Sequence, residues 1–255
     1  MGVRHQRLRL LAALPLAAAL LAGCGATAHR AASQLPPIDS ARCRSGLAPI
    51  GGPRVTVAAV VRSHAVAYRR PGGRPFARFG PLNVNRFPTV FRVLAVVRGR
   101  DCRARWYRVQ LPIKPNGVTG FVRAAGVDTG RVRSRVVVDI SAKRLTLFRQ
   151  GRPVLRASVA VGSSATPTPT GSYYVNQRLI PTDSSGPYGP AAIGISAYSN
   201  VLTGWTQGGP VAIHGTNEPW SIGHAVSNGC IRLHNDVLRR LFKVTPAGTP
   251  VLIRQ

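Results

Sequence analysis

The feature that most limits how this chain can fold is a succession of short apolar runs, rich in β-branched residues and separated by turn signals. Three of these runs precede residue 128: Val55–Val61, Val90–Val97 and Trp106–Leu111. In the last run the pattern alternates, so that Val109 falls on the apolar face and Gln110 on the polar one. Short strands at this spacing favour a small antiparallel β-barrel over residues 54–128.

The second half of the chain continues the β pattern. Val136–Ile140 and Arg144–Arg149 flank a turn, as the two strands of a hairpin do. Val154–Val161 supplies a third strand. We therefore expect residues 132–255 to form a mainly β domain with few short helices.

Two stretches depart from this strand pattern. Residues 236–242 place their apolar side chains on one face, which predicts a helix, and Asn235 or Asp236 can cap its start. Residues 180–210 are rich in Gly, Pro, Ser and Tyr and show little apolar periodicity. A loop of this length inside a compact domain tends to be a functional lid or binding edge.

The N-terminal residues have the organisation of an export signal. The basic region carries three arginines, Arg4, Arg7 and Arg9. The apolar run Leu10–Leu21 ends in Leu21–Cys24, which resembles the box of bacterial lipoproteins and implies cleavage before Cys24 and lipidation of its thiol. An ordinary secretory signal is the alternative. We predict a signal peptide over residues 1–23, a tether over residues 24–53, and a location outside the cytoplasm.

The charge is strongly positive, with 35 Lys and Arg residues against 7 Asp and Glu residues, a formal net charge of +28. In a cytosolic protein such a charge would favour nucleic acid as the partner. Export argues against nucleic acid here. Outside a cell the available polyanions are cell-wall polymers and membrane lipid head groups, and both attract arginine.

A thiol nucleophile site is indicated by Ser227–Arg232, with Cys230 at its centre and His214 upstream. Cysteine attacks as the thiolate, so it needs a nearby proton acceptor, and histidine is the usual one. Gly229 lets the backbone turn sharply and leaves room for a substrate carbonyl. The alternatives are a buried apolar role for Cys230 and a zinc site completed by His234.

The same stretch, IHGTNEPWSIGHAVSNGCIRLHN, resembles the active-site signature of the L,D-transpeptidase (YkuD-type) family. Further segments that resemble this family, in the same order, are Pro167–Gly171, Tyr188–Ser199 and Gly248–Ile253. The resemblance covers residues 136–253. It departs from the family at Asn228, where many members have histidine, so that His214 would serve as the base alone.

The resemblance implies a cysteine L,D-transpeptidase that acts on peptidoglycan stem peptides without a cofactor or metal. Cys230 would attack the carbonyl of the third stem residue, and His214 would move the protons. A second stem would then resolve the thioester and form a cross-link between third-position diamino acids. We expect the backbone N–H groups of Gly229 and Cys230, together with Asn228, to form the oxyanion hole.

Other residues near this signature are candidates for contacts with substrate. Arg232 can bind a stem carboxylate in a bidentate manner or form an ion pair with Asp236. Ser227 can orient His214 or the loop. The remaining candidates are Tyr188, Tyr198, Trp220 and Gly215.

The chain has four cysteines, and export to an oxidising compartment changes what is expected of them. Cys24 takes the lipid and Cys230 must stay free. Cys43 and Cys102 are then left to form a disulfide, with two free buried thiols as the alternative.

The N-terminal module carries a second resemblance. Residues 106–127, WYRVQLPIKPNGVTGFVRAAGV, are similar to the last strands of bacterial Src-homology-type barrels. Such modules bind wall peptides or have a structural role, and both roles stay open for residues 54–128.

Two other functions remain compatible with these residues. One is a thiol L,D-carboxypeptidase that uses water as the acceptor, since the acceptor is chosen by access to the thioester. The other is a non-enzymatic wall-binding lipoprotein with an inactive catalytic fold. In each case the partners would be stem peptides, anionic wall polymers and the membrane through the lipid anchor.

Overall fold

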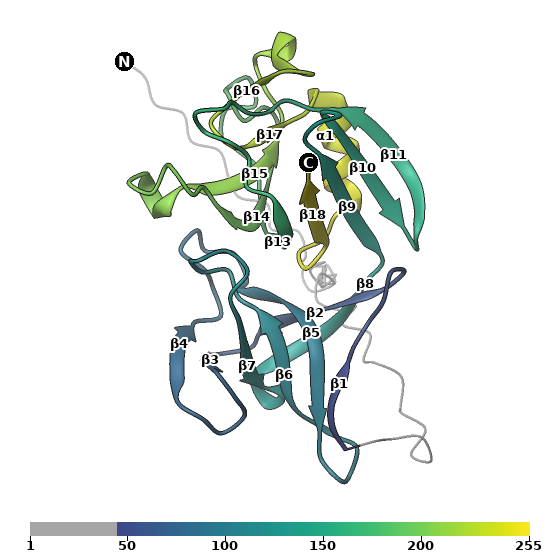
Figure 1. Cartoon of the computed structure of the whole chain (residues 1–255), viewed down its shortest axis with the longest axis vertical. Coiled ribbons are helices and arrows are strands. Elements are labelled where there is room, and N and C mark those ends of the chain that lie inside the picture. Colours follow the sequence, from purple (N-terminus) through teal and green to yellow (C-terminus); the bar gives the residue numbers. More distant parts are fainter. Residues whose placement is uncertain (1–44) are drawn as a thin grey trace, which may run out of the picture. The chain divides into compact units, whose positions relative to one another are not determined.

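The computed structural model describes residues 45–255, and the fold is mainly β as the sequence predicts. The predicted signal peptide, Cys24 and Cys43 lie outside the described residues. Within residues 45–255, no helix is long and apolar enough to cross a membrane. The strands form two eight-stranded sheets and one two-stranded sheet (Figure 1).

The first sheet is antiparallel, with the strand order β4-β3-β7-β6-β5-β2-β8 and with β1 paired to β5. Its strands are β1 Gly46–Pro49, β2 Thr56–Val61, β3 Ala65–Tyr68, β4 Pro75–Phe79, β5 Val90–Arg98, β6 Ala104–Gln110, β7 Thr119–Arg123 and β8 Val127–Val132. A short 3-10 turn, η2 Ala124–Gly126, precedes β8. The three strands expected from the sequence are present as β2, β5 and β6.

The first sheet surrounds its own apolar core, which includes Phe91, Val109 and Val122, each fully buried. Its strand pairing runs from β4 to β8 without joining those two strands. What the structure shows is therefore an antiparallel sheet, and the likeness to Src-homology-type barrels stays a prediction. Because β1 belongs to this sheet, the folded region begins before residue 54, inside the stretch expected to be a tether.

The second sheet is mixed, with the order β11-β10-β9-β18-β13-β14-β15-β17. Its strands are β9 Ser134–Asp139, β10 Arg144–Arg149, β11 Arg152–Ser158, β13 Gly171–Leu179, β14 Ala192–Tyr198, β15 Pro210–His214, β17 Ile231–Arg232 and β18 Pro250–Arg254. The expected hairpin is β9 and β10, which pair in antiparallel register. The two-stranded sheet joins β12 Val161–Gly162 to β16 Ala225–Ser227. Two further 3-10 turns are η3 Thr206–Gly208 and η4 Pro219–Ser221.

Among residues 45–255 there is one α-helix, α1, which spans Asn235–Val244 and confirms the helix expected from the apolar pattern. Leu238 and Leu241 are fully buried in the core of the second sheet. The expected cap is wrong, because His234 is the N-cap residue and no side chain caps this end. Asn235 instead uses its side chain in the candidate site described below.

β14 lies inside the stretch from 180 to 210 that the sequence presents as a loop. Residues 192–197 of this strand are all buried, so both of its faces are covered and no alternation can appear in the sequence. The parts on either side of β14 are irregular, and they line the cleft described below.

Hydrogen bonds join the two sheets where β5 and β6 meet β13. The Gln110 side chain donates to the Ser172 carbonyl at 2.6 Å, and the Tyr174 hydroxyl donates to the Val90 carbonyl at 3.0 Å. Gln110 is only 4% exposed although it lies on the polar face of its strand. The second sheet therefore covers that end of β6.

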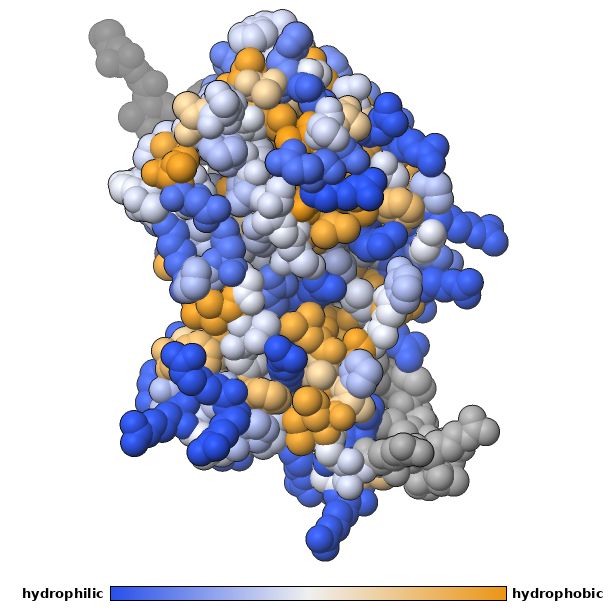
Figure 2. Space-filling view, in the orientation of Figure 1, coloured by the Kyte–Doolittle hydropathy of each residue, from blue (hydrophilic) through white to orange (hydrophobic). Residues whose placement is uncertain are grey.

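The basic residues are distributed rather than gathered. On the face seen in Figure 2, hydrophilic side chains are spread over both sheets, with apolar residues between them. Several arginine planes lie against aromatic rings, such as Arg123 over Trp106 at 4.6 Å and Arg178 over Phe242 at 3.9 Å. Part of the arginine excess is thus used in cation–π packing.

Candidate active site

Two neighbouring parallel strands bring Cys230 and His214 to the same side of the second sheet. Ile213 of β15 pairs with Ile231 of β17, and both isoleucines are fully buried. Side chains alternate along a strand, so the residues next to these isoleucines point to the opposite side. His214 follows Ile213 and Cys230 precedes Ile231, and both line one cleft.

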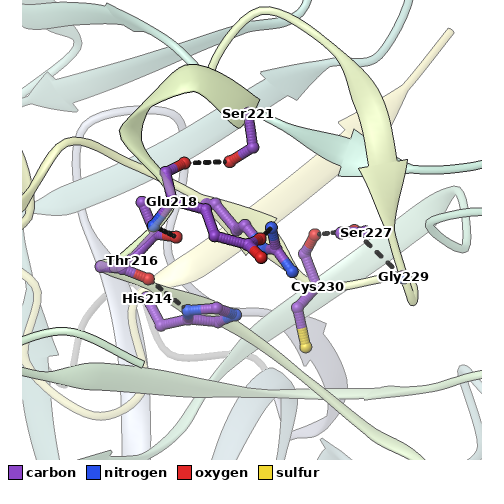
Figure 3. Close-up of polar contacts among 9 residues, drawn as sticks. His214, Thr216, Glu218, Ser221, Ser227, Gly229 and Cys230 are labelled. Atoms are coloured by element: carbon purple, nitrogen blue, oxygen red, sulfur yellow. Dashed lines mark hydrogen bonds and ion pairs between the residues drawn. The ribbon is translucent and has the colours of Figure 1, made fainter. Parts of the chain in front are cut away.

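The turn before Cys230 is held by Ser227, which is 2% exposed. The Ser227 hydroxyl donates to the Cys230 carbonyl at 2.6 Å and accepts the Gly229 N–H at 3.2 Å (Figure 3). Gly229 lies at φ +103°, a conformation that favours glycine. Ser227 therefore orients this loop, which is one of the two roles expected for it.

Two threonines brace the same turn from the segment 167–171 and its neighbour. Thr168 donates from its hydroxyl to the Gly229 carbonyl at 3.0 Å. Thr166 donates to the Ser227 carbonyl, also at 3.0 Å. These two hydroxyl groups thus have a structural role, since they satisfy carbonyl groups of the turn that precedes Cys230.

Cys230 is a half-buried residue and lines the cleft. Burial raises its pKa, while a hydrogen bond from the backbone of Ala212 and the positive charge of Arg232 act in the opposite direction. Burial is the largest of these effects, so the neutral thiol is favoured in the resting protein. A neutral thiol needs a base to take its proton before it can act as a nucleophile.

His214 is 4% exposed, and its Nδ1 lies 2.5 Å from the Gly215 carbonyl. A carbonyl only accepts, so Nδ1 carries the proton and Nε2 holds the free lone pair of the neutral ring. In Figure 3 the Nε2 edge of the ring is turned toward Cys230. Burial lowers the His214 pKa to about 4, with the Gly215 bond raising it and Arg232 lowering it. The ring is therefore a neutral base at pH 7.

Arg232 lies across from His214 in the parallel register of β15 and β17. Its guanidinium forms an ion pair with Glu218, and its side chain is 19% exposed. Glu218 is held in turn, because its N–H donates to the Thr216 hydroxyl at 2.9 Å and its carbonyl accepts the Ser221 hydroxyl at 2.6 Å. The positive charge near Cys230 is thus fixed by a short polar network that includes Glu218 (Figure 3).

Asn235, the first residue of α1, fastens the loop after His214. Its Oδ1 accepts the Thr216 N–H at 2.9 Å, and its Nδ2 donates to the Thr216 carbonyl at 3.1 Å. Gly215 passes so close to this amide that an added Cβ would collide with Asn235 Oδ1. Because Gly215 has no side chain, Asn235 at the start of α1 can approach and hold the peptide unit between Gly215 and Thr216. The carbonyl of that unit accepts the hydrogen bond from the His214 imidazole.

A cleft of about 890 Å³ contains Cys230 and His214. It is lined by Ser227, Asn228, Cys230, Arg232 and His214, together with residues from the irregular stretches around β14. The Tyr188 ring meets the His214 ring edge-on, with the centroids 5.0 Å apart. Tyr188 is half exposed, as expected of a residue that borders a binding groove.

Several expected contacts are not found in the cleft. Tyr198 does not line it; its hydroxyl donates to the carbonyl of Pro112, in the connection between β6 and β7, at 2.8 Å. Trp220 is 66% exposed and also lies outside the cleft lining. Asp236 pairs with Arg240 at 3.6 Å, so the expected alternative partner of Arg232 is wrong.

Two further expectations concern Gly229 and metal binding. The Gly229 N–H already donates to Ser227, while Asn228 is exposed at the cleft wall. The oxyanion hole from Asn228, Gly229 and Cys230 stays a prediction. Over residues 45–255, no group of three or more His, Cys, Asp or Glu side chains could hold a metal ion.

Cys102 is disulfide-bonded, and the expected partner Cys43 lies outside the described residues.

Sequence reasoning missed Ala212, Glu218 and Asn235. Ala212 acts on the Cys230 thiol through a backbone hydrogen bond, which carries no residue-specific signal in the sequence. Glu218 is one of only seven acidic residues in the chain and lies between His214 and Cys230, which is the signal that could have found it. The sequence pattern predicts Asn235 only as a possible helix cap, and its hydrogen bonds to Thr216 become visible only in the structure.

The L,D-transpeptidase catalytic domain family (YkuD) matches residues 133–253. The Bacillus subtilis protein YkuD is 41% identical over 120 residues, which cover 47% of this chain and 65% of the relative. The Bacillus subtilis protein YqjB is 39% identical over 128 residues, which cover 46% of this chain and 69% of the relative. Both are named as candidate L,D-transpeptidases. The chain thus spans slightly less than two thirds of the length of YkuD and slightly more than two thirds of the length of YqjB.

Solved structures give a weaker likeness. Enterococcus faecium L,D-transpeptidase, as a C442S mutant, has a TM-score of 0.36 and 24% identity, with 48% of this chain and 49% of that chain covered. L,D-transpeptidase 3 from Mycobacterium tuberculosis, in complex with a faropenem-derived adduct, has a TM-score of 0.39 and 19% identity, with 56% and 76% covered.

Proposed function

Since this chain belongs to the L,D-transpeptidase (YkuD) family, we propose that it is a peptidoglycan L,D-transpeptidase with Cys230 as nucleophile and His214 as general acid and base. One observation carries the proposal. The half-buried Cys230 and a neutral imidazole with a free Nε2 line one cleft. This is the pairing that acyl transfer to a thiol requires.

In the first half of the reaction, the Cys230 sulfur attacks the carbonyl that joins the third stem residue to the terminal D-alanine. A C–S bond forms, and His214 Nε2 takes the thiol proton. The tetrahedral intermediate then collapses and the C–N bond breaks. His214 gives its proton to the departing amine, so that D-alanine leaves and a thioester remains.

In the second half, the side-chain amine of another stem attacks the thioester. His214 removes a proton from this amine, and the new C–N bond forms as the C–S bond breaks. The proton returns to the thiolate, which restores the resting pair. The energy of the original amide is conserved in the cross-link between third-position residues, so the scheme uses no nucleotide.

The supporting roles follow from where the side chains lie. Tyr188, edge-on to His214 and half exposed, would wall the substrate groove. Arg232 would lower the thiol pKa through its charge as well as attract a stem carboxylate. Asn228 and the Cys230 N–H are the proposed donors to the oxyanion, because the Gly229 N–H is used by Ser227. Losing one such donor costs about 3 kcal/mol of transition-state stabilisation.

The proposed substrate places the protein outside the cytoplasm, facing the cell wall. The lipoprotein box at Cys24 supports an anchor in the cell membrane, and the net charge of +28 supports attraction to anionic wall polymers. Both remain parts of the proposal.

Intact-protein mass spectrometry tests the function. The protein is incubated with a carbapenem and, separately, with a tetrapeptide stem, with and without an amine acceptor. We expect a covalent adduct that Cys230→Ala abolishes and that His214→Ala slows by about 10²–10⁴-fold. His224→Ala, at an exposed histidine, is the control. An adduct that persists in Cys230→Ala would overturn the proposal. Release of D-alanine without a cross-link when the amine is present would identify a carboxypeptidase instead.

A further inference from the structure

The segment between β14 and β15, residues 199–209, forms one wall of the catalytic cleft. Leu202, Trp205 and Gln207 of this segment line the cleft together with Cys230. Trp205 is 52% exposed, so that part of its side chain is accessible. The position of this wall therefore decides what shape of substrate can reach the thiol.

The end of this segment has an uncommon backbone. Three consecutive residues have φ in the left-handed region: Gln207 at +60°, Gly208 at +77° and Gly209 at +73°. Glycine adopts the left-handed conformation freely. For Gln207 this conformation is unfavourable, and it persists only where contacts with the surrounding structure hold it. The backbone supplies part of this support, because the Gly208 N–H donates to the Trp205 carbonyl at 2.7 Å.

The rest of the support comes from the first sheet. Asn85, in the connection from β4 to β5, exchanges two hydrogen bonds with Gln207: Gln207 Nε2 donates to Asn85 Oδ1 at 2.8 Å, and Asn85 Nδ2 donates to Gln207 Oε1 at 3.3 Å. Asn85 Nδ2 also donates to Gln177 Oε1 of β13 at 2.9 Å. Asn85 itself lines the catalytic cleft, although it lies far from the second sheet in sequence.

A second connection of the first sheet holds the beginning of the same segment. The Asn116 side chain accepts the Tyr198 N–H at 2.9 Å and donates to the Tyr198 carbonyl at 2.8 Å. It thus pairs with the end of β14 as a neighbouring strand would. Lys114 lies over the Tyr198 ring at 5.7 Å. The wall is therefore held at both ends by residues between β4 and β7.

We propose that the first sheet is a positioning element of the active site: Asn85 fixes Gln207, and through it the wall 199–209 against which the substrate lies. Asn85 is a positioning residue and takes no part in proton transfer. This role rests on the proposed function for its substrate, a peptidoglycan stem peptide, but the order of the wall can be measured without any substrate.

The first measurement is amide hydrogen exchange over residues 199–209 in the full chain. Without its anchor the wall opens more often, and we expect Asn85→Ala and Gln207→Gly each to speed exchange there about fivefold, the effect of one hydrogen bond of ordinary net strength. Gln207→Gly keeps a residue that tolerates the left-handed backbone, so it removes the anchor without adding strain. Gln150→Ala is the matched control, a glutamine at φ +52° in the exposed turn between β10 and β11.

The second measurement is the steady-state turnover of a tetrapeptide stem with an amine acceptor. We expect KM to rise about fivefold in Asn85→Ala and in Gln207→Gly while kcat stays within about twofold, because the thiol and imidazole are untouched. The double variant should be no worse than either single one, since both remove the same interaction. Gln150→Ala should match the parent.

Unchanged exchange in both anchor variants would overturn the inference, and so would additive effects in the double variant. A parent protein that forms no adduct at Cys230 would overturn the proposed function alone, because the exchange measurement would still decide whether Asn85 orders the wall.

Discussion

Arg232 and His214 face each other across the parallel pair β15 and β17, and the positive charge of Arg232 lowers the pKa of both His214 and the Cys230 thiol. For His214 burial acts in the same direction, so the base is neutral in the folded protein. For Cys230 burial acts in the opposite direction and outweighs the charge. The resting pair is consequently thiol and imidazole rather than thiolate and imidazolium.

The buried neutral His214 predicts a defined dependence of stability on pH. Its pKa is about 4 in the folded protein and 6.5 without burial, so the unfolded chain binds the extra proton in this interval. The free energy of unfolding should fall by roughly 3 kcal/mol as the pH drops from 6.5 to 4. Urea unfolding at several pH values measures this change in the free energy of unfolding. His214→Gln should remove this slope and exposed His224→Gln should retain it; a slope unchanged in His214→Gln would contradict the assignment.

The charge of Arg232 predicts the reactivity of the thiol. In Arg232→Gln the Cys230 pKa should rise further, because a lowering influence is lost. Alkylation by iodoacetamide at pH 8 should then be slower by about twofold or more. Arg232→Lys keeps the charge and serves as the control. Equal rates in the two variants would show that the charge has no effect on the thiol.

Asn235 should stabilise the protein beyond its place in α1. Asn235→Ala removes both hydrogen bonds to Thr216 and should lower the free energy of unfolding by about 2 kcal/mol. It should also reduce turnover, since the loop with Gly215 and Glu218 loses its fastening. Asp236→Ala, at an exposed neighbour, should cost only a few tenths of a kcal/mol. Denaturant titration of both variants decides between a fastening role and a neutral one.

Ser227 should act on the nucleophile loop and not on the base. Ser227→Ala leaves the buried Gly229 N–H and the Cys230 carbonyl without the hydroxyl, and should cost about 2 kcal/mol of stability. The pH dependence attributed to His214 should persist in this variant. Ser164→Ala, at an exposed serine, is the control. Loss of the His214 slope in Ser227→Ala would mean that the serine orients the histidine after all.

The disulfide of Cys102 is expected to join Cys43. Alkylation without reductant, followed by peptide mapping, should label Cys230 and leave both other cysteines unlabelled. Labelling of Cys43 under these conditions would show that Cys102 has a different partner.

Much of this protein follows from local sequence pattern. The alternating runs predict strands, and the apolar face of residues 236–242 predicts α1, because these periods reflect which side chains a single element buries. The sequence pattern does not predict β14, because a strand buried on both faces shows no alternation of apolar and polar residues. The burial of Gln110 was equally hidden, since its cover comes from Ser172, a residue far away in the chain.

The sequence by itself determined which two residues we propose as the reacting groups, because a cysteine beside glycine and a histidine nearby carry their chemistry in their side chains. Only the tertiary structure decided what surrounds them. The Gly215 carbonyl sets the tautomer of His214, Glu218 takes Arg232, and Tyr198 turns to the first sheet instead of the cleft. Such partners depend on strand register and on contacts between distant segments. Any backbone carbonyl or exposed tyrosine looks the same in a sequence, and only distance distinguishes the one that is used.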